Sequence, residues 1–333
     1  LADALQVWLD GGFSVARPSD PAFGQAQSAL GAAVPAEVVD GGCAIALYLA
    51  SEGLPAKWDV RLSKARTFRW GAFVLPAAER IAIESDGRAA VIETRNNGAS
   101  HRIQFHGGAA EWTSGLSPMA RIGVAEGALT VLPREALDFQ LPDHVLSEAL
   151  DHIEPHMLET FRQAVSILEQ YVPAYIPWVR RALSHIFLLN PQQGRVESGS
   201  MENYLGFSHF SAYSNAAALA ELLIHEAAHQ YFNIVCLLGP FDDGTDETLY
   251  YSTAVGRARP LDRIGVAYHA FANVMIYYRE CVAKGIQDDG WCARHIESWT
   301  EGLRVLEQPL RGNPALTDIG RALCEPLIER VRL

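Results

Sequence analysis

His225, Glu226 and His229 form the pattern His-Glu-Ala-Ala-His, which has the residue types and the spacing needed to bind a metal ion. Residues four apart lie one turn along the same face of an α-helix, so both imidazoles can reach one ion. The surrounding run from Ala216 to Phe232 is almost wholly apolar, which predicts a buried helix. Buried polar side chains need partners, and a divalent metal ion would supply one. The alternative is a pair of core histidines bonded to carbonyl groups.

A metal site also needs a third ligand, because two histidines alone hold an ion weakly. The metzincin pattern would place glycine at 232 and histidine at 235, but the chain has Phe232 and Val235, which excludes that class. Glu247 lies 18 residues after His229, close to where thermolysin-like zinc peptidases place a glutamate on the next helix. Glu247 is therefore one candidate.

His269 is the other candidate third ligand. It lies in a helix predicted from Asp262 to about Lys284, with Asp262 as the N-cap. Gly265, Ala272 and Asn273 flank His269 on its own face, and such small neighbours would let two helix backbones come close. A lone histidine in a helix is otherwise a satisfied core or surface residue.

Three blocks of sequence resemble one protein family when they are taken in order. The family is the HExxH-type peptide-modification proteins, which are 2-oxoglutarate-dependent peptide β-hydroxylases encoded beside ribosomally made peptide natural products. The resemblance covers about a quarter of the chain, from Glu197 to Tyr278, and none of the first 140 residues. The similar blocks are Leu223-Ile224-His225-Glu226-Ala227-Ala228-His229-Gln230, then Tyr250-Tyr251-Ser252 with Arg259-Pro260-Leu261, then His269-Ala270-Phe271-Ala272.

The resemblance implies an Fe(II) enzyme that uses 2-oxoglutarate and dioxygen to hydroxylate a side-chain Cβ of a precursor peptide. Such an iron takes two oxygens from 2-oxoglutarate and keeps one position for dioxygen, which leaves three octahedral positions for protein ligands. His225, His229 and His269 would fill them. The alternatives are a zinc metallopeptidase with Glu247 as the third ligand, and a metal-stabilised peptide-binding module without turnover.

The same resemblance calls for a group that anchors the far carboxylate of 2-oxoglutarate. Arg259 is the expected anchor, because a guanidinium pairs two N–H donors with two carboxylate oxygens, and Ser252 or Tyr251 would add a hydroxyl. Glu226 has a different role in each hypothesis. In a peptidase it would be the general base, whereas in an oxygenase it would orient a ligand or bond to substrate or water.

Composition restricts the partners of the protein. The 333 residues carry a formal net charge of -12 with only 27 Lys and Arg, which argues against nucleic acid as a partner. The five cysteines are odd in number and show no regular spacing, which favours a reducing cytoplasm. No basic and then apolar leader is visible, and no uncharged apolar stretch reaches about 18 residues, so we expect neither export nor a membrane span.

The expected fold class is α+β, divided near Pro133 to Pro142 into residues 1–140 and 141–333. The first part predicts antiparallel hairpins, with strands at 67–75, 80–84, 89–94 and 101–105 and turns at Asp86-Gly87 and Asn96-Asn97-Gly98. The second part predicts helices over 143–171, broken at Pro155, and over 177–189. A strand over 204–211 is expected just before the metal-binding helix, either as a core strand or as a strand that pairs with an extended substrate.

Overall fold

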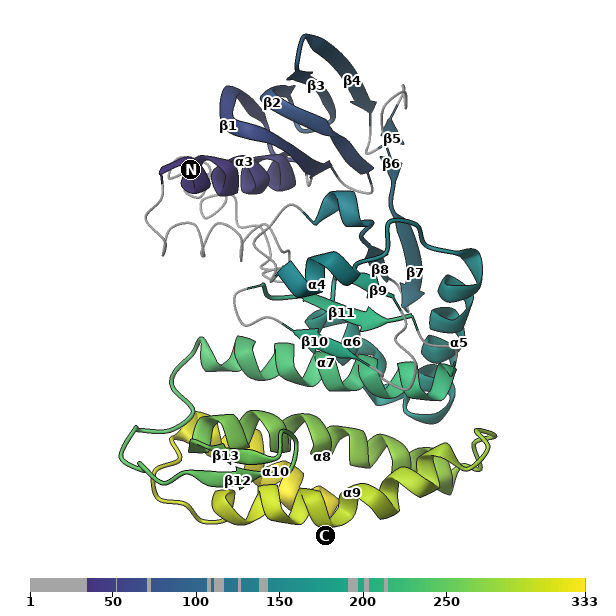
Figure 1. The fold of residues 1–333 in the computed structure, drawn as a ribbon, viewed down its shortest axis with the longest axis vertical. Coiled ribbons are helices and arrows are strands. Elements are labelled where there is room, and N and C mark those ends of the chain that lie inside the picture. Colours follow the sequence, from purple (N-terminus) through teal and green to yellow (C-terminus); the bar gives the residue numbers. More distant parts are fainter. Residues whose placement is uncertain are drawn as a thin grey trace.

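The computed structural model describes residues 35–332 except for 52, 71–72, 107–108, 111–116, 125–126, 138–142, 191–196, 201–203 and 213–214. The expected fold class is confirmed: the protein is α+β, with an antiparallel sheet in the N-terminal half and a mainly helical C-terminal part. Figure 1 shows this order along the long axis, from an N-terminal sheet through a second sheet to a layer of helices that holds the C-terminus.

The N-terminal sheet, called sheet A, is an antiparallel meander that packs one face against helix α3 (Pro35–Ser51). The buried face carries Leu62, Ile81, Ile92 and Ile103, while the residues between them are mostly exposed, as the alternation of a half-buried strand requires. The strands are β1 (Ala56–Trp70), β2 (Phe73–Ser85), β3 (Ala89–Asn96), β4 (Ala99–His106), β5 (Ala109–Ala110) and β6 (Ser117–Pro118).

The predicted turns of sheet A are confirmed, but one predicted strand is wrong. Gly87 and Gly98 both have positive φ, as the expected Asp-Gly and Asn-Gly turns require. The strand predicted over 67–75 is instead the junction of two strands, since β1 ends at Trp70 and β2 begins at Phe73. This junction has no Asn-Gly or Asp-Gly pair, and the residues on both sides of it are apolar. The sequence therefore shows no hairpin turn signal there.

The second sheet, sheet B, is mixed and has the order β10-β11-β9-β8-β7. Strand β11 runs parallel to β9 on one side and antiparallel to β10 on the other, and all five of its residues are buried. The expectation that this strand could pair with a substrate is therefore wrong, because both of its edges are already bonded. The strands are β7 (Ala120–Val124), β8 (Gly127–Val131), β9 (His185–Leu189), β10 (Ser198–Ser200) and β11 (Phe207–Ser211).

Prolines set several helix boundaries in the C-terminal part. The expected break at Pro155 is confirmed, since Pro155 opens a helix of its own as the first residue after its N-cap. The helix predicted over 177–189 is wrong after Ala182, where the buried run His185–Leu189 forms β9. The helices here are α4 (Asp143–Glu148), α5 (Pro155–Tyr171) and α6 (Ile176–Ala182), with short 3₁₀ turns η1 (Arg134–Ala136) and η2 (Pro173–Tyr175).

Helices α7 to α10 and a small hairpin complete the described fold. Helix α7 (Ala216–Cys236) lies between sheet B and α8 (Leu261–Ala283), as Figure 1 shows. The N-cap of α8 is Pro260 and not the expected Asp262, because Pro260 keeps extended backbone and the helix begins directly after it. The remaining elements are β12 (Tyr250–Ser252), β13 (Arg257–Arg259), α9 (Trp291–Glu307), η3 (Gln308–Leu310) and α10 (Asp318–Val331).

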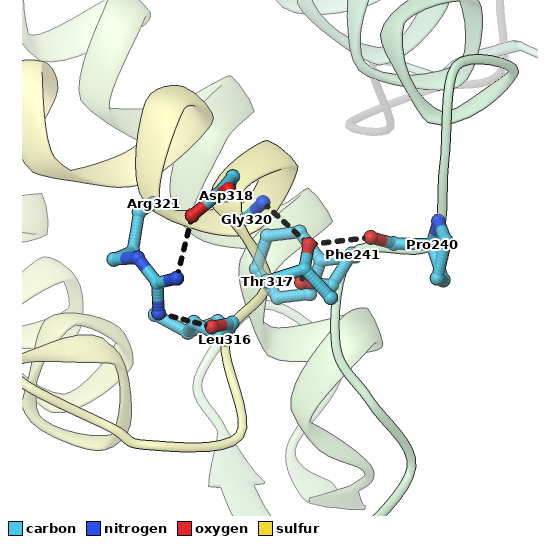
Figure 2. Close-up of polar contacts among 7 residues, drawn as sticks. All are labelled: Pro240, Phe241, Leu316, Thr317, Asp318, Gly320 and Arg321. Atoms are coloured by element: carbon cyan, nitrogen blue, oxygen red, sulfur yellow. Dashed lines mark hydrogen bonds and ion pairs between the residues drawn. The ribbon is translucent and has the colours of Figure 1, made fainter.

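The N-terminus of α10 fixes the segment that follows α7. Figure 2 shows the Thr317 hydroxyl accepting the Gly320 N–H at 3.2 Å while it donates to the Pro240 carbonyl at 2.6 Å. Phe241 lies so close that a Cβ at Gly320 would collide with its carbonyl, and a Cβ at Gly265 would collide with its ring. The small residue at 265 therefore makes room for Phe241 and not, as expected, for the backbone of α7.

The two parts of the chain share packing in the described residues. A cluster of buried apolar side chains joins Val74 of β2 to Leu132, Phe187 and Phe207 around sheet B. Sheet B takes β7 and β8 from before residue 140 and its other strands from after it. The division into 1–140 and 141–333 stays a prediction, and residues 1–34 and 138–142 lie outside the described part. None of the described helices is both long and apolar enough to cross a membrane.

Candidate metal centre

Helix α7 brings His225 and His229 together, as their spacing predicts. Asn215 caps the helix by accepting the N–H groups of Ala217 and Ala218, which fixes where the helix begins. The Nε2 atoms of His225 and His229 are 3.0 Å apart, and their ring centroids are 4.7 Å apart. Two nitrogens aimed at one point either share a proton or face a common cation.

Both imidazoles are held in the neutral state that a metal ion requires. Burial lowers the pKa of His225 well below 6.5, and the neighbouring His229 lowers it further. Burial also lowers the pKa of His229, although nearby Glu226 acts in the opposite direction. Each ring therefore offers a nitrogen lone pair at neutral pH.

Glu226 faces strand β10 with both carboxylate oxygens bonded. The Ser198 hydroxyl donates to Oε1 and the Ser200 hydroxyl donates to Oε2, each at 2.6 Å. Ser208 of β11 lies 2.8 Å from the Ser200 oxygen and can donate to it in turn. The Glu226 side chain is only 1% exposed, so these hydroxyls provide the partners that a buried carboxylate needs. Glu226 thus ties α7 to β10.

His269 lies on α8 in a cluster of aromatic side chains. Its ring stacks on Tyr231 with a 5° angle between the planes, and it also contacts Trp178 and Phe232. Burial lowers the pKa of His269 to about 3, and His229 contributes to that shift, while the backbone of Ala228 acts in the opposite direction. Within the described residues the buried Nδ1 atom of His269 has no hydrogen-bond partner.

The predicted three-histidine set is only partly assembled. Phe271, two residues after His269, packs edge-on against His225 with ring centroids 5.0 Å apart. Residues two apart on a helix point in nearly opposite directions, so His269 projects from a different side of α8 than Phe271 does. In the part of the chain that the structure describes, no three His, Cys, Asp or Glu side chains gather as a metal site would require. His269 as the third ligand stays a prediction.

Glu247 does not lie on a helix. It is exposed and falls in the irregular segment between α7 and β12, beside Asp246. Asp246 accepts hydrogen bonds from Asn313 at 2.9 Å and from the Tyr250 hydroxyl at 2.8 Å. The bonds from Asn313, Thr248 and Tyr250 lower the pKa of Asp246. Asp246, and not Glu247, therefore holds the hairpin that follows.

The β12–β13 hairpin presents Ser252 and Arg259 on one face and Tyr251 on the other. Tyr250 pairs with Arg259 and Ser252 pairs with Arg257, so these four residues share a face of the ribbon. Ser252 is fully buried and its hydroxyl has no partner within the described residues, whereas Tyr251 is 57% exposed. Of the two expected supporting hydroxyls, only Ser252 lies on the same face as Arg259.

Arg259 is part-buried and forms no ion pair with the described residues. The hairpin is fixed to α9 by the Thr253 hydroxyl, which donates to the Gly302 carbonyl at 2.9 Å. Trp299 on the same helix stacks on Phe271, which contacts His225. A chain of contacts therefore runs from the hairpin through α9 and α8 to the histidine pair.

Sequence reasoning missed the partners of Glu226. The signal was present, since Ser198-Gly199-Ser200 puts two hydroxyls on one face of a strand. Gly199 between them faces the ring of His209, where a Cβ would collide.

No family model matches the chain, and no curated protein matches it significantly.

Proposed function

We propose that the protein is an Fe(II)- and 2-oxoglutarate-dependent hydroxylase that modifies a side-chain Cβ of a ribosomally synthesised peptide. The observation that carries this proposal is the pair of neutral imidazoles on α7, whose Nε2 atoms approach to 3.0 Å. Neutral imidazole nitrogens suit Fe(II). Bound iron with 2-oxoglutarate would supply the oxidising chemistry that no protein side chain can supply.

Two of the three donors that this iron site needs already lie together. His225 and His229 would hold the ion, and His269 would complete the set. Support for His269 comes from its buried Nδ1 atom, which lacks a hydrogen-bond partner among the described residues, and from the contribution of His229 to its lowered pKa. A buried nitrogen without a partner is costly unless something binds it.

The surroundings of Glu226 and Glu247 favour an oxygenase over the alternative zinc peptidase. A peptidase requires Glu226 to take a proton from metal-bound water, but both of its oxygens already accept serine hydroxyls. It also requires a third ligand, yet Glu247 is exposed in an irregular segment. An oxygenase needs neither function, so in this proposal Glu226 orients α7 and its histidines from a bonded position.

Arg259 would bind the far carboxylate of 2-oxoglutarate, and Ser252 would add a hydrogen bond. Both residues share a face of the hairpin, and neither the guanidinium nor the hydroxyl has a partner that would compete within the described residues. A planar guanidinium fits a carboxylate through two parallel hydrogen bonds. Anchoring the cosubstrate in this way leaves the peptide to be positioned by the rest of the site.

We further propose that the protein acts in the cytoplasm. The cysteines support this location, because all five are free and four of them are buried, as expected in a reducing compartment. The precursor peptide would be its partner, and we propose neither nucleic acid nor membrane as a partner, because the net charge of -12 opposes binding to polyanions and anionic surfaces.

The proposal is tested by loading the protein anaerobically with Fe(II) and then adding 2-oxoglutarate. A visible charge-transfer absorption that needs both additions is the expected result. Adding candidate peptide and dioxygen should then give succinate and a peptide that is heavier by one oxygen atom. Peptide fragments formed by the zinc-loaded protein without dioxygen would instead establish the peptidase.

A further inference from the structure

Sheet A has a charge opposite to that of the rest of the molecule. Residues 56–106 contain nine Lys or Arg and five Asp or Glu, a formal charge of +4 in a chain whose net charge is -12. The buried face of the sheet holds the apolar cluster against α3, so most of these charges lie on the other face. A local excess of positive charge in an acidic protein indicates attraction for an acidic partner.

Three arginines stand in one row across this exposed face. The register pairs Arg61 of β1 with Arg80 of β2, and Arg80 with Arg95 of β3. All three side chains are exposed. Neighbouring strands are about 4.8 Å apart, so the row spans roughly 10 Å.

Repulsion between the three positive charges of the row destabilises the sheet unless negative charges neutralise them. Like charges directly opposite one another on adjacent strands destabilise a sheet. Asp59 forms an ion pair only with the central arginine, since both of its oxygens bond the Arg80 guanidinium. The bond from Arg80 lowers the pKa of Asp59, and Arg95 adds a smaller electrostatic contribution.

The flanking arginines of the row lack such a partner. Arg61 and Arg95 form no ion pair or side-chain hydrogen bond with the described part of the chain. The nearest other acidic group in register, Glu93, already pairs with Arg102 at 3.6 Å. Two guanidinium groups are therefore available to an external carboxylate.

We propose that the row of Arg61, Arg80 and Arg95 binds an acidic segment of the peptide substrate. This inference rests on the proposed function for the existence of a peptide substrate. Two or three carboxylates on an extended segment match the span of the row, whereas a long polyanion would be repelled by the rest of the acidic surface. In Figure 1 sheet A lies at the end of the molecule opposite α8 and α9, so a segment held here leaves another part of the peptide free for the candidate metal centre.

The test uses fluorescence anisotropy with a labelled peptide of Glu-Thr repeats and a matched peptide of Gln-Thr repeats. Wild-type protein should bind the acidic peptide more tightly, and added salt should weaken this binding. The variant with both Arg61→Gln and Arg95→Gln should bind it roughly tenfold more weakly, because two exposed ion pairs are lost. Its melting temperature should not fall, since the change relieves repulsion within the row.

A matched control variant carries Lys57→Gln in β1 and Arg88→Gln in the turn between β2 and β3, which remove the same charge from exposed positions outside the row. This control should keep the affinity of the wild type. The inference is overturned if the control loses as much affinity as the row variant, if the Gln-Thr peptide binds equally well, or if an RNA oligonucleotide binds more tightly than the acidic peptide.

The binding measurement needs no metal ion, so its outcome is independent of turnover. Acidic-peptide binding at the row by a protein that never forms succinate would support this inference and contradict the proposed function. If the row variant binds the acidic peptide as tightly as the wild type and its hydroxylation is unaffected, the proposed function is supported and this inference is contradicted.

Discussion

At the scale of single residues, the histidine pair makes the strongest prediction. The variants His225→Ala and His229→Ala should each bind at least tenfold less iron than the wild type after anaerobic loading, because each has lost one of a few ligands. His269→Ala should have a comparable effect if α8 supplies the third ligand, whereas Glu247→Gln should leave the iron content unchanged. Metal analysis after gel filtration measures all four variants.

The outcome for His269 separates the two metal hypotheses. Normal iron content in His269→Ala, with metal lost in Glu247→Gln, would contradict the oxygenase ligand set. Circular dichroism serves as the control for folding, because His269 is part of an aromatic cluster with Trp178 and Tyr231.

The bonds between Glu226 and β10 make a prediction about stability. The double variant Ser198→Ala with Ser200→Ala leaves a buried carboxylate without its two donors and should cost about 2–4 kcal/mol of unfolding free energy. Adding Glu226→Leu should recover part of this loss, because the carboxylate is then absent. Urea denaturation measures these two variants and Glu226→Leu alone, and additive effects would show that the hydroxyls do not act through Glu226.

Glu221, one turn before His225, gives a prediction about pH. Burial raises its pKa from 4.5 to about 7, while the nearby Tyr278 hydroxyl has the opposite effect. A raised pKa means that the folded state holds the proton. The contribution of this group to stability is therefore complete below about pH 4.5 and is lost as the pH rises through about 7.

Glu221→Gln removes that titration and keeps the shape of the side chain. The variant should be more stable than wild type at about pH 8, by on the order of 2 kcal/mol, and should differ little at about pH 4.5. The comparison between variant and wild type cancels the titration of the histidines. A difference in stability that stays constant across this range would exclude a titrating Glu221.

At the scale of elements, the contact between α10 and the segment after α7 depends on the absence of a side chain at 320. Gly320→Ala should destabilise the protein by about 1–3 kcal/mol, because its methyl group would meet the Phe241 carbonyl. Gly239→Ala is the control, since a Cβ there meets only a side-chain atom of Ile319 at an ordinary 3.5 Å. Thermal unfolding measures both, and equal melting temperatures would refute the close approach seen in Figure 2.

The elements also show what the sequence could predict. Periodicity was sufficient for α7, since its apolar run and its capping Asn215 are both local signals. It was insufficient for His185–Leu189, because a short apolar run is compatible with either a helix or a buried strand. The direction of His269 depends on how α8 packs, so local sequence could name this residue but could not place its ring.

At the scale of the whole molecule, the two sheets are joined by a shared apolar cluster and by a polar contact. Arg69 of β1 reaches the His185 Nε2 atom of β9 at 2.7 Å, and the Ser184 hydroxyl lies 2.8 Å from Nδ1 of the same ring. These contacts join a residue of sheet A to the strand beside β11. Residues more than a hundred positions apart make this contact, so no local pattern could have predicted it.

This junction should couple the stability of the two sheets. Val74 of β2 is 3% exposed and packs in the cluster with Phe187 and Phe207, so Val74→Ala should cost about 1–3 kcal/mol. Hydrogen exchange followed by mass spectrometry should then show faster exchange in β9 and β11 as well as in β2. Val91→Ala on the outer face of sheet A is the matched control and should affect β3 alone. Faster exchange confined to β2 in the Val74 variant would mean that the two sheets unfold independently, and that the chain divides at the boundary its composition predicts.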